Sequence, residues 1–282
     1  MKKHNTAPTF LVLGAQKCGT TWLANMVSQH PDVSVATKKE MHFFDKAYNY
    51  QKGLNWYEEQ FDITSTTKAI GEFTPNYFWT SEDETEVNEE SGTRNIPKLV
   101  FDAYPDLQLI VCLRNPVDRA ISAYYHHIRN GRIKPHQSIL DVTELYGIES
   151  MGYYDIHLSN WMKYYSFEKF LFVVYEEDIK DECKKVTLEK VFSHIGVDVG
   201  FEPQNMFSRY NSQNSHFDMR TRHYLPIIRD VVRRITPTRI AKNKIWRINV
   251  KDEERKVLAD KFELHNRNIE NLIGRELSYS SK

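Results

Sequence analysis

Residues 14–21 combine the side chains and the flexible backbone that a phosphate-binding loop needs. The segment reads Gly-Ala-Gln-Lys-Cys-Gly-Thr-Thr and holds two glycines, two threonines and one lysine, Lys17. Such a loop binds a phosphate-like anion when it opens a helix, because backbone N–H groups and the helix dipole converge on the ligand. The chemistry expected here is therefore the binding of a phosphate-like group.

The flanking segments supply the elements that such a loop requires. Residues 10–13 are a short apolar run, which predicts a buried strand. After the loop, apolar residues recur at helical spacing until His30-Pro31, where the helix is expected to stop; they are Trp22, Leu23, Met26 and Val27. The alternative is an ordinary strand–helix turn with an exposed lysine, but the strand–loop–helix context favours the anion site.

The loop departs at one position from the P-loop of nucleoside triphosphatases. The pattern G-x-x-x-x-G-K-[ST] places lysine directly after the second glycine, where this chain has Thr20. The positive charge lies inside the loop instead, at Lys17, from where it can reach a bridging or terminal oxygen of the bound group. A P-loop kinase that uses ATP and Mg²⁺, with its lysine displaced, is therefore an alternative.

A carboxylate and an imidazole follow in a second segment, at Glu40 and His42. They precede Phe43-Phe44, and a carboxylate buried beside aromatic rings has a raised pKa, in the range useful to a general base. The alternative is a wet surface ion pair between Glu40 and Lys38 or Lys39. The base is favoured because functional side chains gather on loops that a rigid scaffold presents.

A third segment places an arginine and a serine where a sheet binds its ligand. Residues 107–113 predict the clearest buried strand of the chain, and Pro116 suits the first turn of the helix that follows. Arg114 stands at the carboxyl end of this strand, where open α/β sheets bind ligands, and Ser122 lies about two turns along the helix. A guanidinium and a hydroxyl suit a phosphate. The alternative is that Arg114 pairs with Asp106 or Asp118.

These three segments together resemble a known family. Residues 14–23 resemble the 5′-phosphosulfate loop of sulfotransferases that use 3′-phosphoadenosine 5′-phosphosulfate (PAPS), and residues 114–126 resemble the 3′-phosphate motif of the same enzymes. Residues 39–45 resemble the acidic motif of the heparan sulfate branch. The resemblance extends over about residues 8–200, and the two phosphate motifs occur in family order.

The resemblance implies a reaction and a role for each residue. A sulfuryl group would pass from PAPS to a hydroxyl or amine of an acceptor, a saccharide or another polar small molecule, with Glu40 as base and His42 as its orienter or substitute. Lys17 would stabilise charge on the leaving phosphate. The remaining residues expected to bind the nucleotide are Cys18, Gly19, Thr20, Thr21, Trp22, Arg114, Ser122 and Tyr153, the last in a Gly152-Tyr153-Tyr154 segment that resembles one near the nucleotide.

The sequence departs from the family pattern in two places. The segment Glu72–Tyr77 resembles a Glu-x-Thr-Pro-x-Tyr motif in which a lysine thought to assist at the sulfuryl group often stands where this chain has Phe73. The last third also lacks the Lys-Gly-Arg sequence of a loop that closes over PAPS in related enzymes. Candidates for its work are Arg209, Arg220 and Arg222.

Predicted strands and helices alternate along the chain, which indicates an α/β fold with a mainly parallel central sheet and helices on both faces. The resemblance specifies the P-loop-like sulfotransferase fold. We expect one domain over residues 1–282, with residues 8–200 as the nucleotide-binding and catalytic core. Residues 201–282 would complete it as a basic and helical segment that ends in a long helix over residues 252–273. One covering helix is expected within residues 46–67.

The amino-acid composition narrows the partners, metal sites and cellular locations to be expected. Lysine plus arginine and aspartate plus glutamate both number 38, so no net charge favours a nucleic acid partner. Three scattered cysteines favour neither a disulfide framework nor a zinc site, and no metal is expected, although Glu176-Glu177-Asp178 after a strand invites that interpretation. No apolar stretch reaches the length of a membrane span. We expect a cytoplasmic enzyme of the prokaryotic type or a shortened form of a longer one. A nucleotide-binding module without catalysis stays open.

Overall fold

Five short apolar segments form one parallel sheet, as the sequence predicts. The computed structural model describes residues 6–80, 95–208 and 249–279, and its sheet has the strand order β2-β3-β1-β4-β5 with every neighbouring pair parallel. The strands are β1 (Phe10–Gly14), β2 (Val33–Val35), β3 (Ala69–Phe73), β4 (Gln108–Leu113) and β5 (Phe170–Val174). Every residue of β1 and β3 is buried, because both faces of a parallel sheet are covered.

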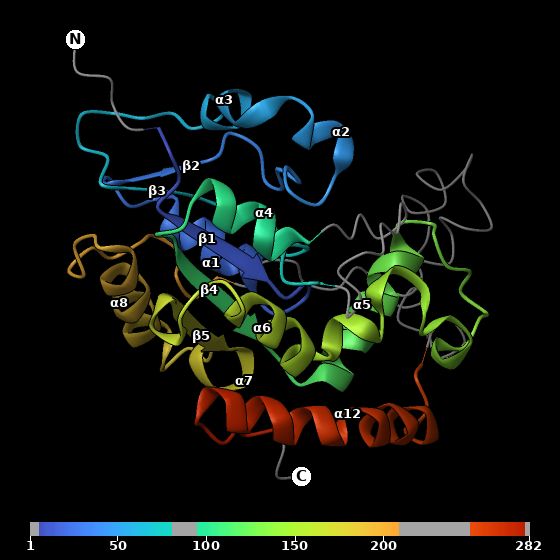
Figure 1. Cartoon of the computed structure of the whole chain (residues 1–282). Coiled ribbons are helices and arrows are strands. Elements are labelled where there is room, and N and C mark those ends of the chain that lie inside the picture. Colours follow the sequence, from blue (N-terminus) through green and yellow to red (C-terminus); the bar gives the residue numbers. More distant parts are fainter. Residues whose placement is uncertain (1–5, 81–94, 209–248, 280–282) are drawn as a thin grey trace, which may run out of the picture.

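Helices cover the two faces of this sheet (Figure 1). On the face turned towards the viewer lie α4 (Ile96–Ala103) and α6 (Tyr154–Met162). On the other face, α1 (Thr20–Val27) contacts α8 (Lys184–Ile195). Right-handed crossovers produce this division, since the chain moves one way across the sheet from β1 to β2 and the opposite way from β3 through β4 to β5.

Two further helices form a layer beside the sheet. In Figure 1, α12 (Asp252–Ile273) runs along the lower edge of the molecule, and it contacts both α6 and α5 (Pro116–Arg129). The carboxylate of Asp155 in α6 accepts hydrogen bonds from His265 Nδ1 at 2.8 Å and Asn268 Nδ2 at 2.9 Å. The long C-terminal helix is thus tied to the core by specific polar contacts.

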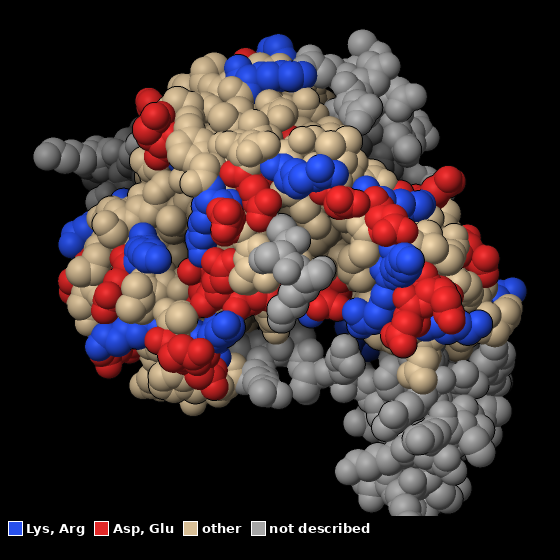
Figure 2. Space-filling model, turned by 90° about the horizontal axis from the view of Figure 1, so that it is seen from below, with Lys and Arg blue, Asp and Glu red and all other residues tan. Residues whose placement is uncertain are grey.

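On the face seen in Figure 2, acidic and basic side chains are interspersed.

The connection between α5 and α6 consists of three 3₁₀ helices, Ile139–Val142, Leu145–Gly147 and Ser150–Gly152. Arg119 of α5 is completely buried beneath it and donates hydrogen bonds to the carbonyls of Gly147 and Ile148. Arg119 therefore has a structural role, although it belongs to the segment that resembles the 3′-phosphate motif.

One expectation about a helix needs correction. The single covering helix expected within residues 46–67 is two short helices, α2 (Ala47–Tyr50) and α3 (Gly53–Glu58), separated where Gly53 adopts a φ of +83°. The segment after β5 begins with one helical turn, α7 (Tyr175–Asp178). Left-handed glycines end α8 and α12, at Gly196 and Gly274.

Some expectations fall outside the described residues. These are residues 209–248 of the expected basic and helical segment, which include the three arginines Arg209, Arg220 and Arg222. Among the helices that the structure describes, none combines the length and apolar character needed to cross a bilayer.

Candidate functional site

One cleft lies at the carboxyl edge of the sheet and receives residues from the segments that follow all five strands. It has a volume of about 930 Å³. The segment after β1 contributes Lys17 and Thr20, the segment after β2 contributes Glu40, and Pro75 follows β3. Arg114 and Ser122 come from the segment after β4, and the segment after β5 adds Tyr175, Lys180 and Lys184. The carboxyl edge of a parallel sheet is where such folds bind ligands.

The loop between β1 and α1 has the backbone geometry of an anion site. Gly19 precedes the helix with a φ of +93°, and with no side chain it leaves the first amides of α1 uncapped and available to a ligand. At Gly14, where φ is +138°, a Cβ atom would lie 2.3 Å from the carbonyl oxygen of Pro75. Both glycines are thus required by conformation or by close approach.

Most of the predicted loop residues line the cleft. Lys17, Gly19, Thr20, Thr21 and Trp22 are on its surface. Cys18 is buried beneath the loop and does not line the cleft; burial raises the pKa of its thiol to about 11. Cys18 was expected to bind the nucleotide, but its side chain is buried beneath the loop and lacks the exposure of a reactive thiol.

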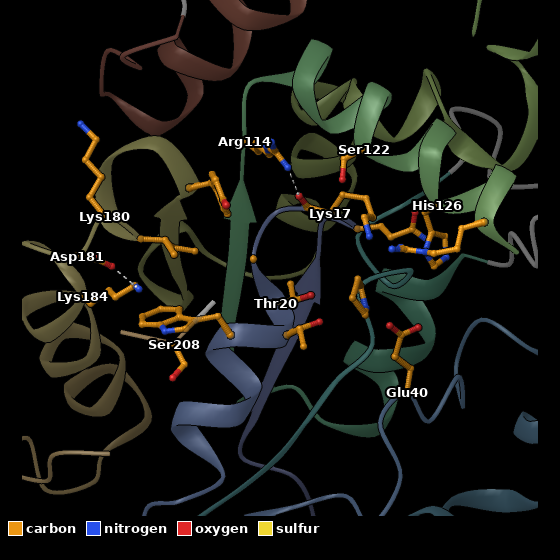
Figure 3. A pocket seen from close by; sticks show the side chains of 18 of the residues that line it. Lys17, Thr20, Glu40, Arg114, Ser122, His126, Lys180, Asp181, Lys184 and Ser208 are labelled. Atoms are coloured by element: carbon orange, nitrogen blue, oxygen red, sulfur yellow. Dashed lines mark hydrogen bonds and ion pairs between the residues drawn. The ribbon is translucent and has the colours of Figure 1, made fainter. Parts of the chain in front are cut away.

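Lys17 has an unusual electrostatic environment. Its burial, together with the charges of Arg129 and Arg114, lowers the pKa of its ammonium to about 8. The lysine is therefore positively charged at neutral pH but close to its titration range. Figure 3 shows it between Arg114 and Ser122 on one side and Glu40 on the other.

Arg114 does not make the ion pairs considered as its alternative. Its Nη1 donates to the carbonyl oxygen of Lys17 at 3.2 Å, its guanidinium lies 4.6 Å from the ring centroid of Tyr175, and its Nε is 3.9 Å from a carboxylate oxygen of Glu176. Asp118 pairs with Arg255 instead, at 3.0 Å. Arg114 is thus held at the rim of the anion loop, and its binding of a 3′-phosphate stays a prediction.

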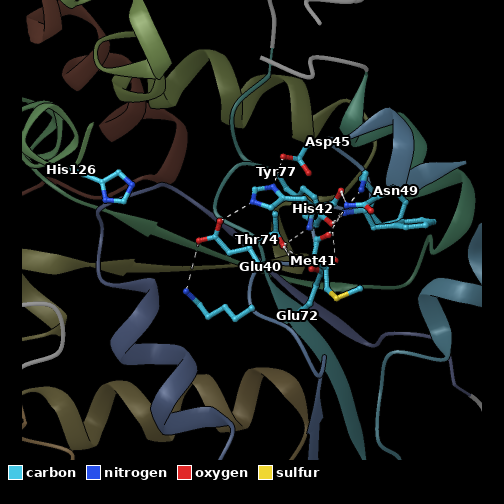
Figure 4. Close-up of polar contacts among 12 residues, drawn as sticks. Glu40, Met41, His42, Asp45, Asn49, Glu72, Thr74, Tyr77 and His126 are labelled. Carbon is cyan, nitrogen blue, oxygen red and sulfur yellow. Dashed lines mark hydrogen bonds and ion pairs between the residues drawn. The ribbon is translucent and has the colours of Figure 1, made fainter. Parts of the chain in front are cut away.

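The acidic segment brings two carboxylates to one imidazole (Figure 4). His42 Nδ1 lies 2.7 Å from Asp45 Oδ2, and its Nε2 lies 3.1 Å from Glu40 Oε2. Burial lowers the pKa of His42, but the hydrogen bonds to Asp45 and Glu40 outweigh burial and raise the pKa to about 9. A protonated ring can donate to both carboxylates at once. His42 therefore fits the role of orienter of Glu40 and not that of its substitute as base.

The expected rise in the pKa of Glu40 is wrong. Burial does raise it, but the hydrogen bond and charge of His42 outweigh burial, helped by Lys39 with its Nζ 4.0 Å from Glu40 Oε1, and hold the pKa below its ordinary value. Glu40 is therefore ionised at neutral pH. The aromatic neighbours Phe43 and Phe44 face Tyr57 and other core rings, and they form part of the core.

Tyr153 is not brought to the cleft. Its ring packs against Phe262 and His265 of α12, with ring centroids 5.6 Å and 4.2 Å away, and its hydroxyl donates to Glu149. The next residue, Tyr154, turns inward and donates to the carbonyl oxygen of Arg114 at 2.9 Å. Of this segment, Tyr154 supports the backbone of Arg114 from the buried side and does not itself line the cleft.

Two residues of α5 were missed by sequence reasoning. His126 and Arg129 line the cleft together with Ser122, four and seven positions after it, so the three share one helical face. Burial and the charge of Lys17 lower the pKa of His126 to about 4, so this imidazole is neutral. The helical spacing from Ser122 was the signal that could have identified both.

The three acidic residues after β5 bind protein groups. Glu176 accepts from the backbone N–H of Asn115 at 3.1 Å, and Asp178 accepts from that of Val174 at 2.6 Å. Glu177 accepts from the backbone N–H of Ser278 at 2.8 Å. In the part of the chain that the structure describes, no group of three or more His, Cys, Asp or Glu residues is arranged to hold a metal ion.

Comparisons with known proteins agree on one protein family. The family model described as the sulfotransferase domain matches residues 7–230. Human heparan sulfate glucosamine 3-O-sulfotransferase 6 is 33% identical over 186 residues, which cover 64% of this chain and 50% of that protein. For human heparan sulfate glucosamine 3-O-sulfotransferase 5 the identity is 27% over 201 residues, covering 67% of this chain and 54% of that protein. The chain thus spans about half the length of these relatives.

The fold also matches a solved structure. A crystal structure of a sulfotransferase from Alicyclobacillus acidocaldarius superposes with a TM-score of 0.70 and 22% sequence identity. The match covers 98% of this chain and 99% of that one, which shows that the two proteins share a fold.

Proposed function

The chain belongs to the sulfotransferase domain family, and we propose that it transfers a sulfuryl group from PAPS to a hydroxyl or amine of a saccharide or another polar small molecule. One observation carries the proposal. A single cleft holds the cationic anion-binding loop with Lys17 and, next to it, an ionised Glu40 fixed by a protonated His42. The names of the relatives, which specify transfer to a glucosamine of heparan sulfate, support a saccharide acceptor.

The residues present suit the two charged ends of PAPS. The amides and hydroxyls of residues 19–21 and the ammonium of Lys17 would hold the 5′-phosphosulfate, as helix N-termini hold anions. Arg114 and Ser122 would hold the 3′-phosphate through charged hydrogen bonds. In Figure 3, Lys180 and Lys184 lie at the end of the cleft away from Glu40 and His126, which leaves the latter end for the acceptor.

The proposed step is an in-line displacement at sulfur. The acceptor oxygen or nitrogen forms a bond to sulfur while Glu40 takes its proton. The bond between sulfur and the bridging oxygen breaks, and its electron pair leaves on the 5′-phosphate, where Lys17 stabilises the developing charge. His42 keeps its proton throughout and holds the Glu40 carboxylate in place. The products are the sulfated acceptor and 3′-phosphoadenosine 5′-phosphate (PAP).

Two measurements test this function. In a thermal-shift comparison, PAP should raise the melting temperature more than ADP or ATP with Mg²⁺, since a ligand stabilises the folded state according to its affinity. A larger shift with ATP and Mg²⁺ would favour the phosphotransferase alternative. In a panel of saccharides, phenols and aliphatic alcohols assayed with labelled PAPS, saccharides should accept the label, and transfer to phenols alone would defeat the saccharide assignment.

Arg114 allows a prediction about the 3′-phosphate. Arg114→Ala should weaken PAP binding by about 1.5–3 kcal/mol, roughly 10- to 150-fold, which is the worth of a hydrogen bond to a charged group. The affinity for AMP, which has no 3′-phosphate, should hardly change. Calorimetry with both nucleotides measures the difference, and Arg267→Ala, at an exposed position on α12, is the matched control. Equal losses for PAP and AMP would contradict the assignment.

The pKa of Lys17 predicts the alkaline side of the pH profile. Lys17 carries its charge below its pKa of about 8 and loses it above, so kcat/KM for PAPS should fall as the pH rises through that value. Arginine keeps its positive charge as the pH rises through 8. Lys17→Arg should therefore move the decrease in kcat/KM to higher pH, even if its rate is lower than that of the wild type. A wild-type profile that stays flat to pH 10 would show that the charge of Lys17 is not required.

A further inference from the structure

A second carboxylate lies behind the site, at Glu72 of β3, and the proposed reaction does not use it. Its side chain is 1% exposed. Oε1 accepts hydrogen bonds from the hydroxyls of Tyr57 at 2.6 Å and Tyr77 at 2.8 Å, and Oε2 accepts one from Thr74 at 2.7 Å. A buried carboxylate is costly unless its oxygens are bonded, and here three hydroxyls meet that need.

Two of these hydroxyls also hold the segment that carries Glu40 and His42. Thr74 Oγ1 accepts the backbone N–H groups of Met41 at 3.2 Å and His42 at 3.4 Å. The hydroxyl oxygen of Tyr77 accepts those of Phe43 at 2.8 Å and Phe44 at 3.3 Å. The backbone N–H groups of four consecutive residues, 41–44, thus donate to two hydroxyls.

The direction of each hydrogen bond follows from this arrangement. A hydroxyl has one proton to donate. Because Thr74 and Tyr77 receive the amide protons of residues 41–44, each directs its own proton to Glu72. The carboxylate therefore fixes how both hydroxyls point. Figure 4 shows Glu72 and Thr74 beside the segment that carries Glu40 and His42.

We propose that Glu72 is a positioning residue for sulfuryl transfer, and that its ionised carboxylate, acting through Thr74 and Tyr77, keeps residues 41–44 in the conformation that holds His42 against Glu40 at the cleft. The inference rests on the proposed function for its kinetic consequence. The structural part of the inference, that the position of His42 depends on Glu72, does not rest on the proposed function.

The proposal makes the site sensitive to protonation at a residue that touches no substrate. A protonated Glu72 must direct its new proton at one of the three hydroxyls, which then loses its acceptor. Burial, and to a smaller extent Asp45, raises the pKa of Glu72 to about 7 against the effect of the three hydrogen bonds. The other titratable groups that face it are the phenols of Tyr57, Tyr77 and Tyr104.

The direction of the pH effect follows because the ionised form of Glu72 is the one that positions residues 41–44. As the pH falls through about 7, Glu72 gains a proton and transfer should decline, although Glu40 is still ionised because its own pKa lies below the ordinary value. An acid limb near neutrality is therefore assigned to Glu72 and not to the base.

The kinetic test is Glu72→Gln, which keeps the shape but cannot carry the charge. Its kcat at pH 8 should be about 10- to 100-fold below wild type, the loss expected for a misplaced catalytic group, with PAP affinity unchanged. The acid limb near pH 7 should be absent from its kcat profile. A wild-type kcat and an unchanged limb in Glu72→Gln would overturn the proposal.

A second test does not depend on activity. The pKa of the His42 ring, followed by NMR and assigned with a His42→Gln variant, should lie near 9 in the wild type and fall towards its usual value in Glu72→Gln and in Thr74→Val. Thr74→Ser restores the hydroxyl and should restore the high pKa. The control is Thr187→Val, which removes a buried hydroxyl elsewhere that donates to the carbonyl of Asp178. This variant should leave the pKa of His42 unchanged.

The two tests separate the possible failures. If wild-type protein transfers no sulfuryl group but the His42 pKa falls in Glu72→Gln, the proposed function fails and the positioning role of Glu72 stands. If transfer is observed but the His42 pKa stays near 9 in folded Glu72→Gln and Thr74→Val, the positioning role is wrong.

Discussion

Replacing Glu40 with glutamine should lower turnover by about 10²–10⁴-fold, the range found when a general base is removed. Glutamine keeps the size of the side chain and can still contact His42, but it cannot accept the proton of the acceptor. Because Glu40 is not among the groups expected to hold the nucleotide, the affinity for PAP should remain at the wild-type value. Steady-state rates with saturating PAPS, combined with calorimetry, measure both quantities.

His42 supplies the internal comparison for this prediction. It is protonated at neutral pH through its contacts with Asp45 and Glu40, so His42→Ala should reduce turnover less than Glu40→Gln does. The reverse order would identify His42 as the base. Full activity in Glu40→Gln would remove Glu40 from the mechanism.

Lys17→Ala should lower the rate of the chemical step by about 10²–10³-fold, as when a group that stabilises transition-state charge is deleted. The affinity for PAP should decrease much less, because the uncapped amides of α1, together with Arg114 and Ser122, still bind its phosphates. Charge builds up on the leaving phosphate only as the bond to sulfur breaks, so the loss appears in kcat rather than in binding.

Single-turnover kinetics distinguishes this role from simple anchoring. Lys98→Ala removes a lysine that pairs with Asp102 on α4, at an exposed position, and should leave the rate unchanged. If Lys17→Ala strongly weakened nucleotide binding while the PAPS that does bind still reacted at the wild-type rate, Lys17 would be an anchor only.

The sequence predicted the elements that present the site because their signals are local. The apolar runs of β1, β4 and β5 and the glycines around Lys17 can be recognised within a few residues. The place of the cleft, at the carboxyl ends of the strands, follows from the general rule for parallel sheets once those elements are known. Arg114 and Ser122 were found for the same reason.

The electrostatic state of the site could not be predicted because it depends on partners distant in the sequence. The pKa of Glu40 was expected to rise from burial, but the contact with His42 reverses the direction. The supports of residues 41–44 come from Thr74 and Tyr77, more than thirty positions away. Glu72 was named only as the first residue of the Glu72–Tyr77 motif, and only the fold reveals that it lies behind the site.

The position of β1 in the sheet has a consequence for how the protein is made. β1 is the first strand of the sheet in the chain, yet it lies at the centre, where Phe10 is in register with Gly71 on one side and Gln108 on the other. During synthesis its apolar residues have no partner strand until residues 69–73 have been translated, and the second partner strand follows only at residues 108–113. Pairing over such sequence separations is slow and leaves apolar segments exposed to aggregation. We therefore expect the yield of folded protein to depend on chaperones that shield the nascent chain, and the anion-binding loop to form only late in biogenesis.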